Sequence, residues 1–582
     1  MRRPIVLTIL VVLLVLAAGL MTGAMRDESA TVDETGYLGA GYSFFKTGSY
    51  RLTEGHPILS QIIASFPMLF FDVHESPTAT ALMQGKAMVP YTPRWSGPIG
   101  STRELFPGGP EFYQWALPET QLFGQMLVYD PVNPAEPMLF WGRLTQVVLT
   151  IVAGLVVFAW ARQLFGNNAG LMAAVMWAMN PIVLAYGHLI LTDMSITLMF
   201  AVTLWLFGRF LREPSLKRTL AVGVALGLSF TMKFTALSLI PACAVLSCVF
   251  WLREKPQPAN GRAWPALLAL RLIPMLLVGW AVVMIVYFPN WSPAPPIDPE
   301  RALQLGVPGW FQSLRPILIP KDFFKGLALL VGHAREGGDS YLLGQWSKTG
   351  WWYYYFVALA LKSPIPLLLL MATGGAWLVR RLPQASFERL VPWTGALVYL
   401  GFAMTGKIDI GIRHVLPIFP LLAVGVADQV AGAGRKWQIG AWVLCGWLTL
   451  ASLFAYPFYI QYFNELAGGP NNGANLLIDS NFDWGQDAKR LKKLLEERGI
   501  QHIYLDYFGT QSSIEYLKIP NTRVNAEQAK QIVQGTLVVS ASQLMRPEWV
   551  WLRESKQPVA RVAYTLFVYQ LTGQTAPVKQ SS

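Results

Sequence analysis

The chain has 582 residues, of which 53% are hydrophobic and only 14% are charged. Soluble proteins carry about 25% charged residues, and the apolar residues here stand in runs of about 16 to 24, long enough to cross a bilayer core. These values exclude soluble globular, disordered and fibrous proteins. The net charge of +12 does not indicate nucleic-acid binding, because the basic residues lie mostly in short loops between apolar runs, where they orient a membrane protein, and not on one soluble face.

The apolar runs predict a polytopic α-helical membrane protein with about eleven transmembrane helices. The first run, residues 5–24, follows Met1-Arg2-Arg3 and exceeds the h-region of about 7–15 residues in a signal peptide, so we expect an uncleaved anchor. If the N-terminus is cytoplasmic, the most basic short loops, such as 209–218, all lie inside. The other predicted spans are 139–160, 170–187, 190–210, 219–235, 236–252, 266–289, 352–379, 391–405, 414–431 and 437–459.

This topology leaves three long segments outside the membrane: residues 25–138, residues 290–351 and a tail from residue 460. We expect a transmembrane catalytic domain over 1–459, including both external loops, and a small soluble α/β domain over 460–582. In the tail, an amphipathic helix is predicted at 486–498 and strands at 502–507, 536–539 and 562–570. In the first loop, helices are expected at 33–45 and 56–71, before a Pro- and Gly-rich, irregular insert over 75–137.

Charged residues inside or beside membrane spans are costly and are candidates for function by default. In this topology several lie near the same outer face. Each has an ordinary alternative: an acid at a helix N-terminus, a helix cap, a snorkelling lysine, or a solvated loop charge. Their shared side favours a functional site that suits an anionic headgroup. The candidates are Asp33, Glu34, His56, Asp193, Lys233, Arg413, His414 and Glu465, with Asp409 as a possible partner of Arg413.

Familiar catalytic motifs do not occur in a usable context. There is no Walker loop, GxGxxG, HExxH or GxSxG motif, so ATP-driven transport, dinucleotide chemistry and serine hydrolysis lack support. The three cysteines, Cys243, Cys248 and Cys445, lie in apolar segments and form neither a disulfide framework nor a metal site. Asp and His without diagnostic spacing form a weak ligand set, so a divalent cation is possible but not indicated.

Four segments together resemble a known family. ATVDETGYLGAGYSFFKTGSY with GHPIL, LGLSFTMKFTA, IRHVLPIFP, and YFNELAGGPNNGANLLIDSNFDWGQDAKRLKKLL resemble, in order and sidedness, glycosyltransferases of family 39. This family includes protein O-mannosyltransferases and the related aminoarabinose transferases. The resemblance implies the GT-C membrane fold, a polyprenyl-phosphate-linked sugar donor and a bacterial inner (plasma) membrane location, with the active site facing the periplasm or exterior.

The resemblance also implies residue roles. Asp33 would be the base that accepts the acceptor proton, with Glu34 orienting it, while Lys233, Arg413 and His414 would hold the donor phosphate. His56, Asp193 and Glu465 would contact sugar or acceptor. One carboxylate and direct displacement predict inversion at the anomeric carbon. The acceptor could be a protein, a lipid or a glycan. Two alternatives stay open: a transporter or flippase of a lipid-linked glycan, whose coupling charges should lie near mid-membrane, and a scaffold for envelope assembly.

Overall fold

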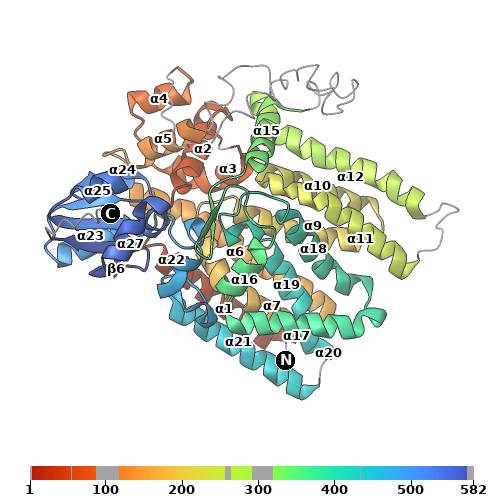
Figure 1. The fold of residues 1–582 in the computed structure, drawn as a ribbon. Helices are drawn as coiled ribbons and strands as arrows, with labels where there is room; N and C mark the ends of the chain where they lie inside the picture. The colour runs from red at the N-terminus through yellow and green to blue at the C-terminus, as the bar shows by residue number, and fades with distance from the viewer. Residues whose placement is uncertain are drawn as a thin grey trace, which may run out of the picture.

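A computed structural model describes residues 3–53, 55–86, 117–255, 264–291, 319–432 and 434–572 of the chain. Most of these residues are helical, and a small sheet forms near the C-terminus. Figure 1 shows the sheet domain, in blue, beside one end of the helical bundle, whose helices extend away from it. The predicted fold class, a polytopic helical membrane protein with a C-terminal α/β domain, is confirmed.

Each predicted span is a helix or a pair of helices. Among the described residues, seven helical segments are long and apolar enough to cross a membrane: Pro4–Ala24 in α1 (Arg3–Ala24), α6 (Ala135–Phe165), α9 (Asp193–Arg212), Phe234–Glu254 with α11 (Leu239–Glu254), Leu268–Tyr287 in α12 (Trp264–Tyr287), Ile365–Gln384 with α17 (Ile365–Arg381), and α21 (Arg435–Ala455). The other predicted spans are shorter or interrupted helices: α7 (Asn167–Ala178) with α8 (Pro181–Tyr186), α10 (Leu216–Met232), α16 (Tyr354–Lys362), α18 (Phe387–Ala403), and α19 (Ile418–Val426) with α20 (Asp428–Gly432).

Proline explains two of these interruptions. Pro181 is the first residue of α8, and the Asn180 side chain caps that helix by accepting a hydrogen bond from the Ile182 N–H. Pro364 stands directly before α17 and separates it from α16. Since proline lacks an N–H and its ring clashes with the preceding turn, it suits a helix start and ends a continuing helix.

Helix α10 is held against α12 by close backbone packing. A Cβ on Gly227 would lie 2.4 Å from the Gly279 carbonyl oxygen, and one on Gly223 would lie 2.7 Å from the Met275 carbonyl oxygen. Gly223 and Gly227 are four residues apart on one face, the small-residue spacing that lets membrane helices approach closely. This packing fixes the end of α10, where the chain continues into Lys233.

Segment 25–138, which the sequence predicts to be external, forms helices at one end of the membrane helices. The two predicted helices are present, and the insert at 75–137 is less irregular than expected, because helices occupy both of its ends; its residues 87–116 lie outside the described residues. These elements are α2 (Glu34–Thr47), α3 (Leu59–Ser65), the 3-10 helix η1 (Phe66–Phe70), α4 (Pro77–Met83) and α5 (Leu117–Val128).

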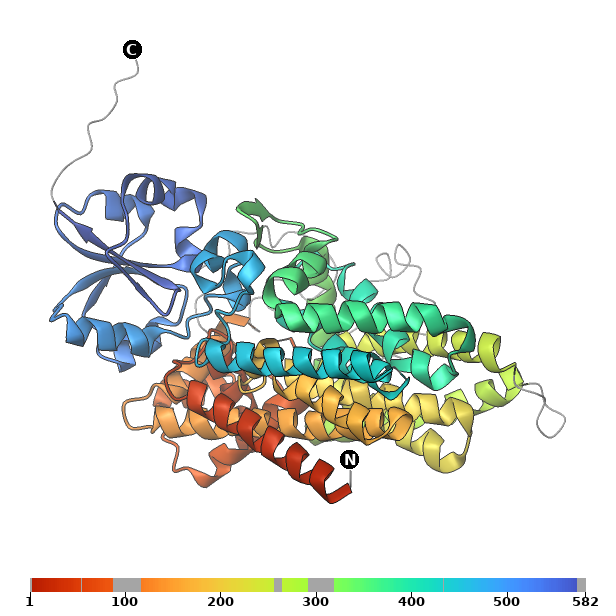
Figure 2. The ribbon, with the colours of Figure 1, turned by 90° about the horizontal axis from the view of Figure 1, so that it is seen from below.

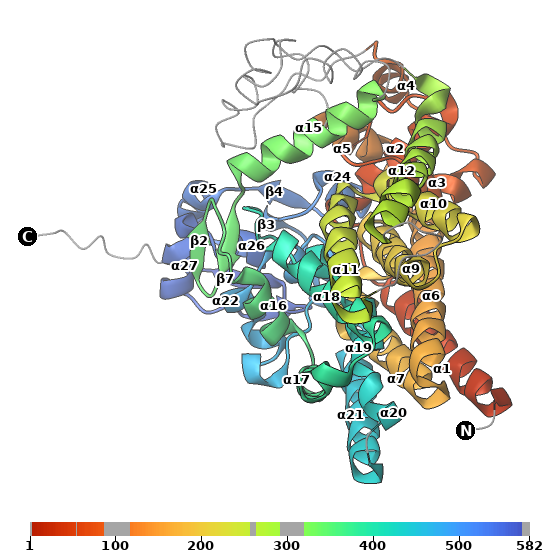
Figure 3. The same ribbon diagram turned by 90° about the vertical axis from the view of Figure 1, so that its right-hand side faces the viewer.

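The loop at 290–351 contributes one long helix and a hairpin; its residues 292–318 lie outside the described residues. Helix α15 (Lys321–Glu336) leads toward the hairpin of β1 (Ser340–Leu342) and β2 (Gln345–Ser347). Figure 3 shows α15 crossing from the ends of α2 and α12 toward the C-terminal domain.

The C-terminal domain has a five-stranded sheet. Its strand order is β4 (Asn521–Arg523), β3 (Ile503–Asp506), β5 (Gly535–Ser540), β7 (Leu566–Leu571) and β6 (Ala560–Val562). β3 pairs in parallel with β4 and β5, while β7 pairs antiparallel with β5 and β6. The three predicted strands correspond to β3, β5 and β6–β7, and the predicted amphipathic helix is α23. Figure 2 shows this domain at one end of the elongated bundle. The main helices of the domain are α23 (Ala488–Glu497), α24 (Gln511–Tyr516), α25 (Ala526–Lys530), α26 (Ala541–Leu544) and α27 (Val550–Ser555).

Candidate active site

Asp193 and Lys233 form the base of the candidate site. Asp193 begins α9 and Lys233 follows the last residue of α10, so these antiparallel neighbours bring both side chains to one end of the bundle. The Lys233 Nζ lies 2.8 Å from the Asp193 Oδ1, and both side chains are almost fully buried. The basic segment 209–218 joins the other ends of the two helices, about 30 Å away by the length of α9.

Arg413 connects this pair to the segment 25–138. It lies in the short 3-10 helix η6 (Ile412–Val415). Its Nη1 is 3.5 Å from the Asp193 Oδ2 and its Nη2 is 3.3 Å from the Asp33 Oδ2. Asp33, Asp193, Lys233 and Arg413, which we call the four-charge cluster, therefore come from four separate parts of the chain and balance two positive charges with two negative ones.

The tail segment before α23 closes one side of the cluster. The Arg413 Nε donates to the Ser480 Oγ at 3.3 Å, and the guanidinium carbon lies 4.3 Å from the centre of the Trp484 ring. The Trp484 carbonyl accepts a hydrogen bond from the Val32 N–H, next to Asp33. The tail thus holds both Arg413 and the residue before Asp33, so it is part of the site.

Asp33 is the most accessible acid of the cluster. It stands at the N-cap position of α2, and its carboxylate makes no capping hydrogen bond. Its side chain keeps 22% of its exposure, against 2% for Asp193. Burial raises the pKa of the Asp33 carboxyl; the Asp193 charge adds to this, while Arg413 and Lys233 oppose it. A carboxylate with a raised pKa is a better proton acceptor.

Glu34 points into a different environment from Asp33. Its Oε1 accepts from the Arg143 Nε at 2.8 Å and from the Ile190 N–H at 3.1 Å. Its Oε2 accepts from the Arg143 Nη2 at 2.7 Å and from the Thr31 N–H at 2.8 Å. Burial raises the pKa of Glu34, but the charge of Arg143 and these hydrogen bonds more than offset it, so the pKa is lowered. The structure therefore does not bring Glu34 into the four-charge cluster.

The two predicted histidines lie near the cluster, whereas no contact of Glu465 with it is found among the described residues. His414 follows Arg413 directly, and its buried Nε2 has no hydrogen-bond partner within the described ranges. The His56 ring lies 6.0 Å from the ring of Tyr37 in α2, and its charge and that of His414 influence each other. Glu465 is exposed at the start of the 3-10 helix η7 (Glu465–Ala467), and no ion pair in the described ranges includes it.

The cluster has a poor chemistry for holding a metal ion. Among the described residues, no three His, Cys, Asp or Glu side chains gather in a way that could bind one. Both oxygens of Asp193 already face cations, which leaves positive N–H groups around the site. Such groups suit an anion such as a phosphate.

Asp409, the possible partner of Arg413, binds elsewhere. Its Oδ2 accepts from the Trp351 N–H at 2.7 Å, so it anchors the segment before α16. Burial raises its pKa to about 6, although that hydrogen bond lowers it.

Several residues at the site could not be recognised from the sequence. Ser480 and Trp484 belong to the segment LIDSNFDWGQD. This segment lies in the tail, which the sequence predicts to be a soluble domain. Asp479 lies close enough to Asp33 and Arg413 to sense their charges, and burial raises its pKa to about 6. Arg143 was hidden inside a long apolar run. An arginine within a predicted membrane span was the sequence signal that could have pointed to Arg143.

Comparisons with known proteins found one family model and several solved structures similar to this chain. Residues 138–284 match the family model described as dolichyl-phosphate-mannose-protein mannosyltransferase; the segment includes Asp193 and Lys233. No curated protein sequence matches the chain. Among solved structures, ArnT from Cupriavidus metallidurans bound to undecaprenyl phosphate is similar with a TM-score of 0.46 and 11% identity, over 96% of this chain and 97% of that chain.

Two further structures are similar to this one. The archaeal oligosaccharyltransferase AglB from Archaeoglobus fulgidus gives a TM-score of 0.43 and 12% identity, over 98% of this chain and 75% of that chain. The S. cerevisiae Pmt1-Pmt2 protein O-mannosyltransferase complex gives 0.32 and 16%, over 50% and 34%. The family match agrees with the resemblance found in the sequence: within this integral membrane protein, residues 138–284 are similar to the dolichyl-phosphate-mannose-protein mannosyltransferases.

Proposed function

We propose that this enzyme transfers a sugar from a polyprenyl-phosphate donor to an acceptor hydroxyl at the outer face of the membrane, with inversion at the anomeric carbon. The observation that carries the proposal is the four-charge cluster, in which an accessible carboxylate, Asp33, pairs with the buried Arg413, and Asp193 joins Arg413 to the buried Lys233. The matching family model is named for a lipid-phosphate-linked mannose donor, which is a phosphate ester of the kind these cations suit.

The donor phosphate would be held by Lys233 and Arg413. Asp193 keeps these two cations next to each other, since its two oxygens face one cation each. The contacts of Arg413 with both acids, at 3.3 and 3.5 Å, are longer than a tight charge-assisted hydrogen bond of about 2.7–2.9 Å. A phosphate would therefore replace loose contacts. Its arrival at Arg413 would also free the Asp33 carboxylate.

The transfer needs one proton acceptor and one leaving group. The acceptor hydroxyl oxygen attacks the anomeric carbon and its proton passes to Asp33, while the bond from the anomeric carbon to the phosphate oxygen breaks. The electron pair of that bond leaves with the phosphate, whose added charge Lys233 and Arg413 stabilise. The product lipid phosphate is weakly basic, so no separate general acid is required. A single direct displacement inverts the anomeric centre.

Other residues complete the proposed site. His56 and His414 would bind sugar hydroxyls or phosphate; the buried and unpartnered Nε2 of His414 supports this. Glu34 would orient Asp33 by fixing the start of α2 through Arg143. Glu465 stays a predicted acceptor contact. The cluster lies at the end of α9 that is opposite the basic segment 209–218. This position supports a site at the outer face of the membrane, because basic loops remain in the cytoplasm.

The test is sugar release from labelled polyprenyl-phosphate donors by the purified protein, with cell-envelope extract as acceptor. We expect the wild type to consume donor and produce free polyprenyl phosphate, while Asp33→Asn folds but consumes none. Asp27→Asn, which changes an exposed carboxylate nearby, is the matched control and should behave as wild type. NMR of the product gives its anomeric configuration. Movement of intact donor between leaflets, unchanged by Asp33→Asn, would instead identify a flippase.

A further inference from the structure

A polar recess lies on the C-terminal domain, outside the four-charge cluster. We call it the basic groove; it has a volume of about 140 Å³ and is lined by residues of the 470–475 turn, α27 and β6–β7. None of the described residues that line it is acidic, whereas three are cationic. Its polar and aromatic lining residues used here are Asn471, Asn475, Arg553, Lys556, Arg561 and Tyr569.

The cations of the groove are held in different ways. Arg561 lies with its guanidinium carbon 4.7 Å from the centre of the Phe567 ring, and its Nη1 donates to the Asn471 carbonyl at 3.1 Å. Its other N–H groups remain available for a planar or tetrahedral oxyanion. Arg553 is used structurally, since its Nη1 donates to the carbonyls of Leu544 and Arg546. Lys556 is half-buried and has no ion-pair partner among the described residues.

The groove is physically connected to the candidate active site. Asn475, at its rim, lies in the short helix α22 (Gly473–Leu476), five residues before Ser480, which contacts Arg413. Five residues span at most about 18 Å. The Asp479 N–H also donates to the Ser542 Oγ, which ties this segment to α26 beside the groove. One extended molecule could therefore occupy both places.

The size of the groove limits what it can hold. Pockets for whole small ligands measure about 300–1,000 Å³, so this recess suits one charged group of a larger molecule. The exposed amides of Asn471 and Asn475 offer hydrogen bonds to hydroxyl groups beside that charge. An extended peptide would gain little here, because the neighbouring sheet edge, β6, has only three residues for strand pairing.

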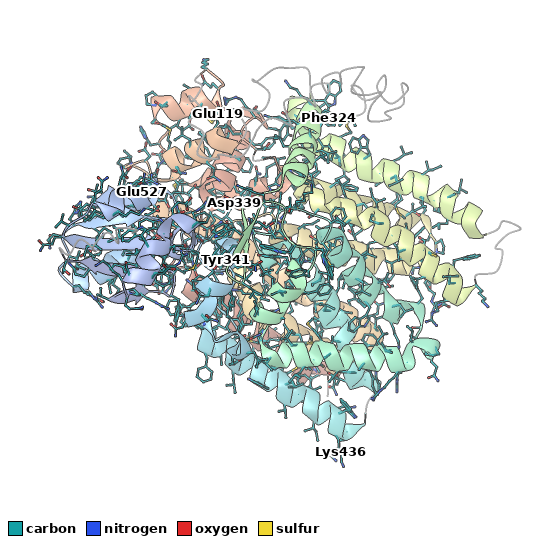
Figure 4. All side chains as sticks on the ribbon, viewed as in Figure 1. Glu119, Phe324, Asp339, Tyr341, Lys436 and Glu527 are labelled. Atoms are coloured by element: carbon teal, nitrogen blue, oxygen red, sulfur yellow. The ribbon has the colours of Figure 1, made fainter. Side chains whose placement is uncertain are left out.

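We propose that the basic groove binds an oxyanion, a carboxylate or a phosphate, carried by a carbohydrate acceptor whose hydroxyl then reaches Asp33. This rests on the proposed function, whose acceptor it specifies. Figure 4 places Tyr341, whose hydroxyl donates to the Asn475 carbonyl at 3.5 Å, between the C-terminal domain and the membrane helices, and Lys436 at the far end of α21. The groove thus lies on the same side of the molecule as the cluster, away from the predicted cytoplasmic end of α21.

The experiment measures binding to the full-length protein in detergent by calorimetry. The probes are a pentagalacturonate oligomer, its fully methyl-esterified and uncharged form, glucose 6-phosphate, and hexaglutamate as an acidic peptide. The variant is Lys556→Gln with Arg561→Gln; Arg553 is kept because it holds backbone carbonyls. The matched control, Lys493→Gln with Arg498→Gln, removes the same charge from exposed positions on and just after α23.

We expect the wild type to bind galacturonate or glucose 6-phosphate, but not the esterified oligomer. The groove variant should bind at least about tenfold more weakly, and the control variant should match the wild type. Binding to the carboxylate or to the phosphate alone supports the proposal and identifies the anion. Absence of binding to both, equal weakening in the control variant, or tighter binding of hexaglutamate would overturn it.

Donor consumption, measured separately with Asp33→Asn, distinguishes the two proposals. If anionic sugars bind in the groove but no donor is consumed, the proposed function fails while the groove stands. If donor is consumed in an Asp33-dependent way and no anionic sugar binds, the groove assignment fails alone.

Discussion

Two ion-pair systems lie side by side at the start of α2, and they differ in how completely they are satisfied. In the Glu34–Arg143 pair, the five N–H groups of Arg143 meet five acceptors: two Glu34 oxygens and the carbonyls of Met25, Glu28 and Ser29. In the four-charge cluster, Arg413 makes contacts of 3.3 and 3.5 Å to its acids. A saturated pair offers nothing to a ligand, whereas loose contacts can be exchanged for one. The comparison assigns structure to Glu34 and ligand binding to the cluster.

The largest expected effect is on turnover in Asp33→Asn. The substitution keeps the size of the side chain but removes the proton acceptor, and general bases contribute about 10²- to 10⁴-fold. Donor consumption should fall by that factor. The melting temperature should stay close to wild type, because in the part of the chain that the structure describes the Asp33 carboxylate makes no cap and a single ion pair at 3.3 Å. If Asp33→Asn stays active, Asp33 is not the proton acceptor, and the four-charge cluster is no longer distinguished from the Glu34–Arg143 pair by a role in the reaction.

The next largest effect is on stability in Glu34→Gln. Breaking a buried ion pair leaves an uncompensated charge and costs about 3–5 kcal/mol, here on the Arg143 side chain, which is 2% exposed. Thermal unfolding in detergent should occur at a clearly lower temperature than for wild type or Asp33→Asn. If Glu34→Gln melts normally but loses turnover, Glu34 acts in the chemistry and the assignment to structure is wrong.

A smaller effect, on the KM for the donor, is expected for Arg413→Lys. The charge is kept, but the fork that spans Asp33, Asp193 and Ser480 is lost, and Lys does not replace Arg at such a site. We expect KM for the donor to rise about tenfold with a smaller change in kcat. Arg490→Lys, which alters an arginine paired with Asp487 in the C-terminal domain, is the comparison variant. A pure loss of kcat would contradict a role in donor binding.

The smallest effect is a displacement of the pH–rate profile. Asp33 acts as a base only when ionised, and burial together with Asp193 raises its pKa. Activity should therefore fall, as the solution becomes more acidic, at a higher pH than the value of about 3.9 for an ordinary aspartate. Lys233→Gln removes a charge that lowers this pKa, so the acidic limb should move to still higher pH. A limb that moves to lower pH would exclude Asp33 as the titrating base.

Some of the architecture followed from local sequence rules. The length and polarity of the apolar runs predicted the membrane helices, because backbone groups in a bilayer must be satisfied within a helix. The alternation of basic loops predicted which polar residues share a side. The amphipathic pattern of α23 and the β-branched runs of β3 and β5 predicted the C-terminal α/β domain. Each of these depends on residues close together in the chain.

The partnership of each charge depended on the tertiary structure. Asp33 and Glu34 are adjacent in the sequence, yet successive helical residues are turned by about 100°, so one faces Arg413 and the other Arg143. Ser480 and Trp484 are more than 60 residues beyond Arg413, and their place at the site follows from the docking of the tail. The sequence alone therefore determined a membrane glycosyltransferase-like chain with its polar residues on one side. Which acid meets which cation was decided only by packing, because long-range contacts leave no local pattern to read.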